Sequence, residues 1–171
     1  NGMISLGFDE SYTRIGVSIV KGNNSKDAKI LYYNSFDYNG CKDKSEKRRF
    51  VKRLTKKILA VYNPDIIIVE RIRTFSQNFL SVPYIKTTGA LIATIVDTAY
   101  PRKVYSADTR SWKSRICGNA SGMHKADKGV SVRYIMKRFN LTLNDDEADA
   151  ICIALYGLDF EKNKRLLKVE E

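Results

Sequence analysis

The chain has 171 residues, of which 43% are hydrophobic and 29% charged, proportions that suit one globular domain with a full core. No run of eighteen apolar residues and no signal-peptide pattern occurs, so we expect no membrane span and no secretory leader. Cys41, Cys117 and Cys152 match neither a disulfide framework nor a zinc spacing, which predicts reduced thiols in a cytoplasmic protein. We expect a single domain over residues 1–171, with an expression scar at residues 1–2 and a flexible tail at residues 161–171.

Positive charge is concentrated in two segments. The formal net charge is +11. Residues 41–57 hold nine Lys/Arg against two acids, and residues 102–138 hold ten against two. Clustered positive charge is the electrostatic signature of a polyanion partner, so we expect a nucleic acid. Acidic membrane lipid and an ordinary solvated surface are the alternatives.

The spacing of apolar residues predicts the elements in chain order. Residues 3–11 and 14–21 alternate with period two and indicate a hairpin, and residues 29–38 indicate a third strand. A helical stripe follows and ends at Asn63-Pro64. The apolar run DIIIVE is typical of a strand buried on both faces of a parallel sheet. The expected elements after the third strand are a helix over residues 43–62, a strand over 65–70, a helix over 77–99, a strand over 103–105 and helices from about residues 108, 125 and 144.

The resulting order is β-β-β-α-β-α-β-α-α-α. It predicts an α/β fold with a mixed five-stranded sheet, in which a three-strand meander is joined by parallel strands and helices flank the sheet. This arrangement resembles the ribonuclease H-like fold.

Four carboxylates occupy informative positions. Asp9 lies late in the first strand and Glu70 ends the buried strand, while Asp146 and Asp149 share one face of the last helix. Each alone has an ordinary explanation as an ion pair, a strand end or a complement to the helix dipole. That explanation is weakest for Asp149, which lies among small and apolar residues beyond the first turn, where a lone carboxylate is costly. Together the four predict a site at the strand ends of the sheet.

The other polar residues at the start of the last helix have simpler roles. Asn144 and Glu147 have the spacing of a capping box, and Asp145 complements the helix dipole.

Carboxylate oxygens are the usual ligands of Mg²⁺ or Mn²⁺. We expect the four acids to be both catalytic and metal-binding, with two ions per active site that activate water and stabilise the leaving oxygen in phosphodiester cleavage. The basic segments would then hold the phosphate backbone. The residues concerned are Asp9, Glu70, Asp146 and Asp149.

The segments LGFDES, IIIVERI and NDDEADAICIAL, in this order and spacing, resemble the RuvC-type Holliday junction resolvases of the ribonuclease H-like superfamily. The family pattern is an Asp in the first strand, a Glu ending the fourth, and D-x-x-D-A opening the last helix. It covers nearly the entire chain and falls on the same four acids. The short, Lys-rich and Tyr-rich form resembles the phage-encoded variants, such as the resolvase of lactococcal phages, more than it resembles the bacterial chromosomal enzymes.

The resemblance implies a crossover junction endodeoxyribonuclease, a homodimer that uses Mg²⁺ or Mn²⁺ to cut branched DNA and leaves 5′-phosphates. Four-way junctions are the expected substrate, with forks and flaps as further candidates, in the host cytoplasm if the gene is phage-encoded. Basic residues that precede the last acidic pair in the family match Lys113, Lys125 and Lys128, which we expect to contact DNA. Ordinary surface lysines are an equal alternative for each of them. The aromatic residue that opens the junction falls here on Arg73, with Phe75 further on. Both are expected DNA contacts, and strict junction selectivity stays open.

Two alternatives stay open. A RuvX/YqgF-like protein shares the architecture and acts in RNA processing, so structured RNA would be its substrate. A non-catalytic junction-binding module would use the acids as caps and ion pairs. The helix over residues 77–99, with the apolar run Leu91–Val96, is the candidate dimer interface. Burial of that run against the chain's own sheet is an equal alternative.

Overall fold

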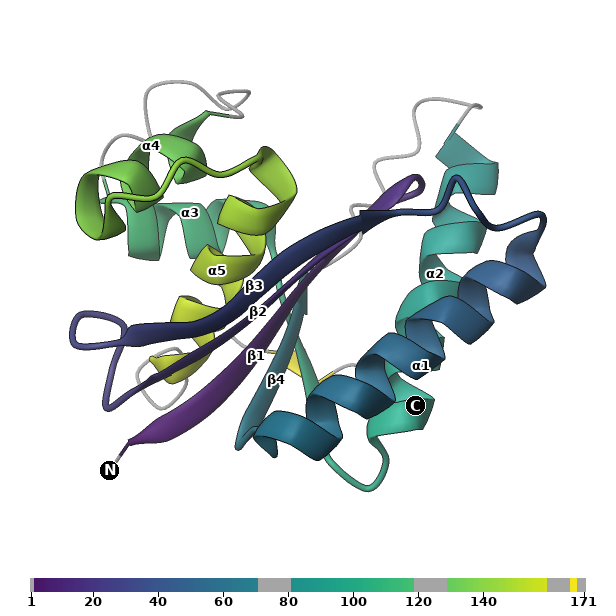
Figure 1. Ribbon diagram of the computed structural model, residues 1–171, viewed down its shortest axis with the longest axis horizontal. Helices are drawn as coiled ribbons and strands as arrows, with labels where there is room; N and C mark the ends of the chain where they lie inside the picture. The colour runs from purple at the N-terminus through teal and green to yellow at the C-terminus, as the bar shows by residue number, and fades with distance from the viewer. Residues whose placement is uncertain (1, 71–80, 119–128, 160–166, 169–171) are drawn as a thin grey trace.

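The computed structural model describes residues 2–70, 81–118, 129–159 and 167–168, which Figure 1 shows in colour. The strands are β1 (Met3–Glu10), β2 (Arg14–Gly22), β3 (Lys29–Asp37), β4 (Ile66–Glu70), β5 (Val104–Ala107) and β6 (Leu167–Lys168). The helices are α1 (Lys44–Tyr62), α2 (Ser81–Ala99), α3 (Thr109–Cys117), α4 (Val130–Phe139) and α5 (Asp145–Leu158). The predicted succession of strands and helices is confirmed up to α5.

The strands form one mixed sheet in the order β3-β2-β1-β4-β5-β6. β1, β2 and β3 make an antiparallel meander, whereas β4 runs parallel to β1 and β5 runs parallel to β4. The five expected strands are therefore confirmed. β6 is an addition, because Leu167–Lys168 belong to the segment expected to be a flexible tail but pair antiparallel with β5. The open edge of β5 offers unpaired backbone groups that such a segment can satisfy.

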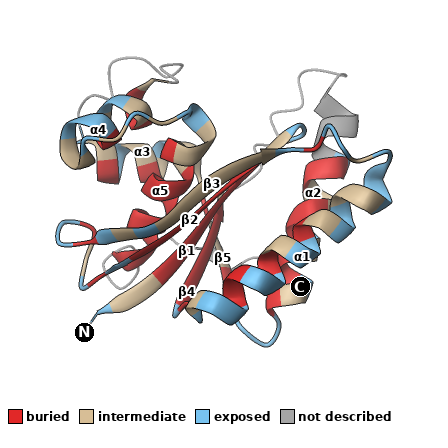
Figure 2. Ribbon diagram, viewed as in Figure 1, coloured by how far each residue is buried: buried red, intermediate tan, exposed pale blue. Residues whose placement is uncertain are grey.

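Helices cover both faces of the sheet: α1 and α2 pack on one face, and α3, α4 and α5 on the other (Figures 1 and 2). Because successive side chains of a strand point to opposite faces, each strand serves two cores. In β1, Leu6 and Phe8 join the core under α1 and α2, while the alternate residues Gly7 and Asp9 face α5. The strand therefore directs Asp9 toward the helix that carries the other two predicted aspartates.

Two glycines let α5 lie directly on the sheet. A Cβ on Gly7 would be 2.5 Å from the Ala154 nitrogen, and one on Gly16 would be 2.2 Å from the Asp146 carbonyl oxygen. Any side chain at either position would push the helix away, so the missing side chains permit the close backbone approach. The contact at Gly16 fixes the first turn of α5 against β2.

The apolar run in α2 is buried within the chain. Leu91 and Ile95 are fully buried, and Ile92 and Val96 are nearly so, in the core that α2 shares with α1 and the sheet. The alternative, burial of this run against the chain's own sheet, is therefore confirmed. A dimer interface on another side of the helix stays a prediction. None of the helices in the described part of the chain has the length and apolarity needed to cross a membrane.

Candidate active site

Asp9 and Glu70 lie side by side at one end of the sheet. β1 and β4 run parallel with Phe8 opposite Val69, so the next residue of each strand reaches the same edge. Asp9 is 7% exposed, and Glu70 is half-buried. The Glu70 Oε2 atom accepts a hydrogen bond of 2.7 Å from Nε1 of Trp112, a fully buried residue of α3. The indole thus gives one carboxylate oxygen a defined position.

The first two turns of α5 bring Asp146 and Asp149 to the same place. The predicted capping box is confirmed, with Asn144 and Glu147 exchanging side-chain and backbone hydrogen bonds. Asp146 accepts a hydrogen bond of 2.6 Å from Nε of Arg14 in β2. Asp149 accepts one from the hydroxyl of Ser131, a buried residue of α4. Each aspartate is therefore oriented by a different neighbouring element.

The electrostatics show that the four acids converge. The pKa of Asp9 lies well above its usual value, first because Asp9 is buried and then because Glu70, Asp149 and Asp146 place negative charge nearby. Their repulsion favours the neutral form of Asp9.

Asp149 is perturbed in the same direction. Burial raises its pKa to about 7, the Ser131 hydrogen bond opposes the rise, Glu70 adds to it and the Lys113 ammonium opposes it. Two strands and one helix thus hold four mutually repelling carboxylates.

This donor set suits a hard divalent cation. Among the described residues, no three Asp, Glu, His or Cys side chains are already arranged around a common metal position. Three of the four acids instead accept hydrogen bonds from Trp112, Arg14 and Ser131. Carboxylate oxygens are the ligands that Mg²⁺ and Mn²⁺ prefer. Positive charge would offset both the burial of Asp9 and the repulsion by its neighbours, which together raise its pKa. The residues therefore fit the predicted metal by their chemistry.

Of the expected DNA contacts, the structure describes one. Lys113 is on α3, close enough to Asp149 to lower the pKa of that carboxyl, and its Nζ lies 5.5 Å from the centre of the Trp112 ring. It therefore borders the acidic cluster. The other four, Arg73, Phe75, Lys125 and Lys128, lie outside the described residues.

Three partners of the acids were not predicted. Arg14, Trp112 and Ser131 are 132, 42 and 18 residues from the carboxylates that they contact. No local spacing signals such contacts. Only Trp112 carried a signal in the sequence. It is the single tryptophan of the chain, and a buried indole N–H usually has a hydrogen-bond acceptor.

Comparisons with known proteins place the chain in a family. The family model described as crossover junction endodeoxyribonuclease RuvC matches residues 5–156, which include all four acids. The crossover junction endodeoxyribonuclease RuvC of Prochlorococcus marinus is 24% identical over 159 residues, covering 91% of this chain and 98% of the relative.

Solved structures share the architecture. Thermus thermophilus RuvC, in complex with a Holliday junction substrate, matches with a TM-score of 0.76 at 16% identity, over 98% of this chain and 99% of that one. The yeast mitochondrial Holliday junction resolvase Ydc2 matches with a TM-score of 0.60 at 16% identity, over 92% and 78% of the two chains. These likenesses confirm the expected ribonuclease H-like fold. Since the family model spans most of the chain, the protein belongs to the RuvC family of crossover junction endodeoxyribonucleases.

Proposed function

We propose that this protein is a metal-dependent, structure-selective endonuclease that cleaves Holliday junctions and other branched DNA, leaving 5′-phosphates. The observation that carries the proposal is the convergence of Asp9, Glu70, Asp146 and Asp149, in which the last three place negative charge close to the buried Asp9. Four buried or half-buried acids in a chain of net charge +11 would be an unfavourable arrangement without a cationic ligand. Membership of the RuvC family supports the same conclusion.

Asp9, Glu70, Asp146 and Asp149 would hold two Mg²⁺ or Mn²⁺ ions. When bound, such a pair supplies an activated water and stabilises the leaving oxygen of the phosphodiester. The protein's own contribution is orientation: Trp112 fixes one oxygen of Glu70, and Ser131 fixes one of Asp149. Outer contacts of this kind tune ligand position and basicity.

The substrate and its contacts are part of the proposal. Lys113 borders the acids and is suited to a phosphate next to the scissile bond. Arg73, Phe75, Lys125 and Lys128 are proposed as further DNA contacts. One site cuts one strand, so resolution of a four-way junction calls for two sites, which a two-fold homodimer supplies. The proposed location is the cytoplasm, that of the host if the gene is phage-encoded.

Cleavage of end-labelled substrates tests this function. We expect paired nicks in a synthetic four-way junction with Mg²⁺ or Mn²⁺, weaker cutting of forks and flaps, and little cutting of linear duplex. Ligation of the products without prior phosphorylation would establish 5′-phosphates. Preferential cutting of structured RNA would contradict the proposed substrate. Binding of the junction without nicking would contradict the enzymatic role.

A further inference from the structure

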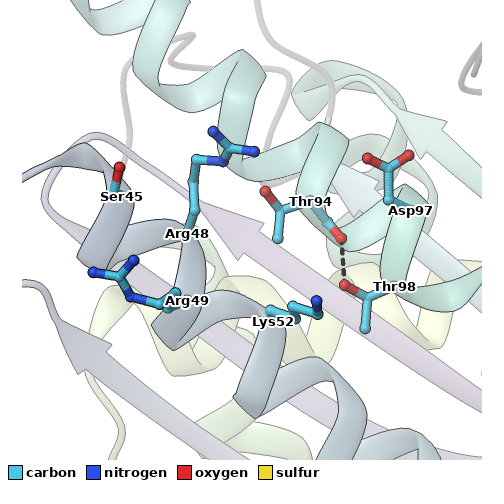
Figure 3. Close-up of a pocket in the computed structure, with 7 residues that line it drawn as sticks. All are labelled: Ser45, Arg48, Arg49, Lys52, Thr94, Asp97 and Thr98. Atoms are coloured by element: carbon cyan, nitrogen blue, oxygen red, sulfur yellow. Dashed lines mark hydrogen bonds between the residues drawn. The ribbon is translucent and has the colours of Figure 1, made fainter.

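Residues of α1 and α2 line a cationic groove. The two helices lie on the sheet face opposite α5 (Figure 1). The volume of the groove is about 390 Å³. Figure 3 shows Arg48 and Lys52 on α1, with Lys52 reaching toward Thr98 on α2. The groove is separate from the acidic cluster. Its lining consists of Ser45, Arg48, Arg49, Lys52, Thr94, Asp97 and Thr98.

The cations of this groove belong to an uncompensated helix surface. α1 contains eight Lys/Arg and one acid, Glu46, and that acid accepts a hydrogen bond of 2.7 Å from the Lys42 backbone nitrogen. No ion pair joins Arg48, Arg49 or Lys52 to another described residue. Their side chains are exposed, so their charge is available to a ligand.

The charges are also repeated at a spacing that disfavours the isolated helix. Cations recur four residues apart in two rows, which puts like charges next to each other along the exposed face. Each such pair destabilises a helix by about 0.2–0.5 kcal/mol, and a polyanion laid along α1 would remove that repulsion. The rows are Arg48, Lys52 and Lys56, and Arg49, Arg53 and Lys57.

The α2 wall of the groove supplies few donors. The Thr94 hydroxyl donates to the Ala90 carbonyl at 2.9 Å, and the Thr98 hydroxyl donates to the Thr94 carbonyl at 2.6 Å. Asp97 adds an exposed negative charge. An anion seated at the α2 side would therefore meet repulsion, whereas a chain of phosphates that follows α1 would meet cations along its length. This geometry favours a polymer over a single small anion.

α1 begins beside the proposed active site. Lys47, in the first turn of α1, donates to the Tyr12 carbonyl at 3.4 Å, and its Nζ lies 4.8 Å from the centre of the Tyr12 ring. Tyr12 is in the turn between β1 and β2, three residues after Asp9. A helix of 19 residues extends for about 28 Å, which corresponds to about eight base pairs at 3.4 Å each.

We infer that the exposed basic face of α1, including the groove against α2, binds the sugar–phosphate backbone of a duplex arm that extends from the active site. This inference rests on the proposed function and adds a surface to it. Contacts of this kind position DNA without reading its sequence. A membrane partner fits less well, because the apolar side of α1, including Val51, Ile58 and Leu59, is buried in the core. A helix that lies in a membrane surface needs that side for insertion.

Salt-dependent binding tests the inference with two variants that each remove three positive charges. The groove variant is Arg48→Gln/Arg49→Gln/Lys52→Gln. The control is Lys21→Gln/Lys26→Gln/Lys29→Gln, at exposed positions near the other end of β2 and β3. Binding of a four-way junction with long arms is measured in EDTA over a series of salt concentrations. We expect the slope of log affinity against log salt to shrink by about two to three in the groove variant and by less than about half a unit in the control.

Arm length and lipid provide the remaining readouts. Shortening the arms to a few base pairs should shrink the difference between wild type and the groove variant, because a short arm covers only the start of α1 and not its whole length. Equal slopes in both triple variants would overturn the inference. The inference would also be overturned if wild type, but not the groove variant, sedimented with phosphatidylglycerol vesicles while both proteins had the same salt slope for DNA binding. Wild type could fail to nick the junction while the salt slopes of the groove variant and the control still differed. That result would support DNA binding by α1 and contradict only the proposed nuclease activity.

Discussion

The Arg14 guanidinium holds Asp146 at 2.6 Å, from Nε to Oδ2, across 132 residues of sequence. The contact extends into a small network, since Arg14 Nη2 lies 3.4 Å from the Ser35 hydroxyl and that hydroxyl accepts a bond of 2.9 Å from Asn144. A side-chain cation thus occupies part of the coordination capacity of a proposed metal ligand. Arg14 and a divalent ion are expected to compete for Asp146.

Replacing Arg14 by Gln is expected to raise the affinity of the metal-free protein for Mn²⁺ severalfold, because it removes a competing positive charge. The ion pair is partly exposed, with side chains 41% and 21% accessible, so its loss should cost less than about 1 kcal/mol of stability. Titration calorimetry with Mn²⁺ measures the affinity, with Lys21→Gln as a charge-matched control. An unchanged or weaker affinity would refute the competition.

Trp112→Phe is expected to lower Mn²⁺ affinity or cleavage by about 10–100-fold, the usual effect of losing a contact that orients a ligand. The phenyl ring keeps most of the buried volume but cannot donate to Glu70. Ile116→Val, at another buried position of α3, controls for loss of packing. If both variants had equal effects at equal stability, the indole hydrogen bond would have no orienting role.

Asp149→Asn is expected to stabilise the metal-free protein at alkaline pH. The pKa of Asp149 is raised to about 7 in the folded protein, so between about pH 4 and pH 7 the folded state binds the proton more tightly than the unfolded state. The stability that the protonated Asp149 carboxyl gives to the folded state is therefore lost as the pH rises to 7. Calorimetry in EDTA should show a higher Tm for the variant at pH 8 and a smaller difference at pH 5. A variant that is less stable than wild type at pH 8 would refute this account.

Asp159 should contribute in the opposite direction. Burial raises its pKa, but hydrogen bonds from Ser25 and Arg115 outweigh burial and leave the pKa below its usual value. Stability from Asp159 is thus present at neutral pH and lost as pH falls through the folded pKa. Asp159→Ala should cost about 2 kcal/mol at pH 7, because it leaves the buried Ser25 without its acceptor. Urea unfolding at pH 7 and pH 3 measures the change, which should shrink at pH 3.

The sequence predicts this fold well because its signals are local. Period-two strands, the buried run before Glu70 and the capping box at Asn144 each depend on neighbours within one element. The approach of Asp9 and Glu70 follows from one further rule, that parallel strands end at a common edge. The approach of Asp146 and Asp149 depends in addition on how α5 packs against the sheet at Gly7 and Gly16.

Contacts between remote elements could not be predicted in this way. The positions of Arg14 and Ser131 beside the acids depend on sheet register and helix packing. The burial of Leu91 and Ile95, on the side of α2 that faces the core, also depends on tertiary packing, because an apolar helical stripe fits a protein core and a dimer interface equally well. The pairing of Leu167–Lys168 with β5 carries no periodic pattern, since it involves only two residues.

Cleavage of a four-way junction by Asp149→Asn tests the central claim most directly. With Mn²⁺ present, we expect wild type to nick opposing strands, and Asp149→Asn to bind the junction at least as tightly without nicking it. Asp145→Asn removes the same charge from an exposed position in the first turn of α5 and should cut like wild type. Nicking by Asp149→Asn at the wild-type rate, or its loss in both variants, would contradict a catalytic role for the converging carboxylates.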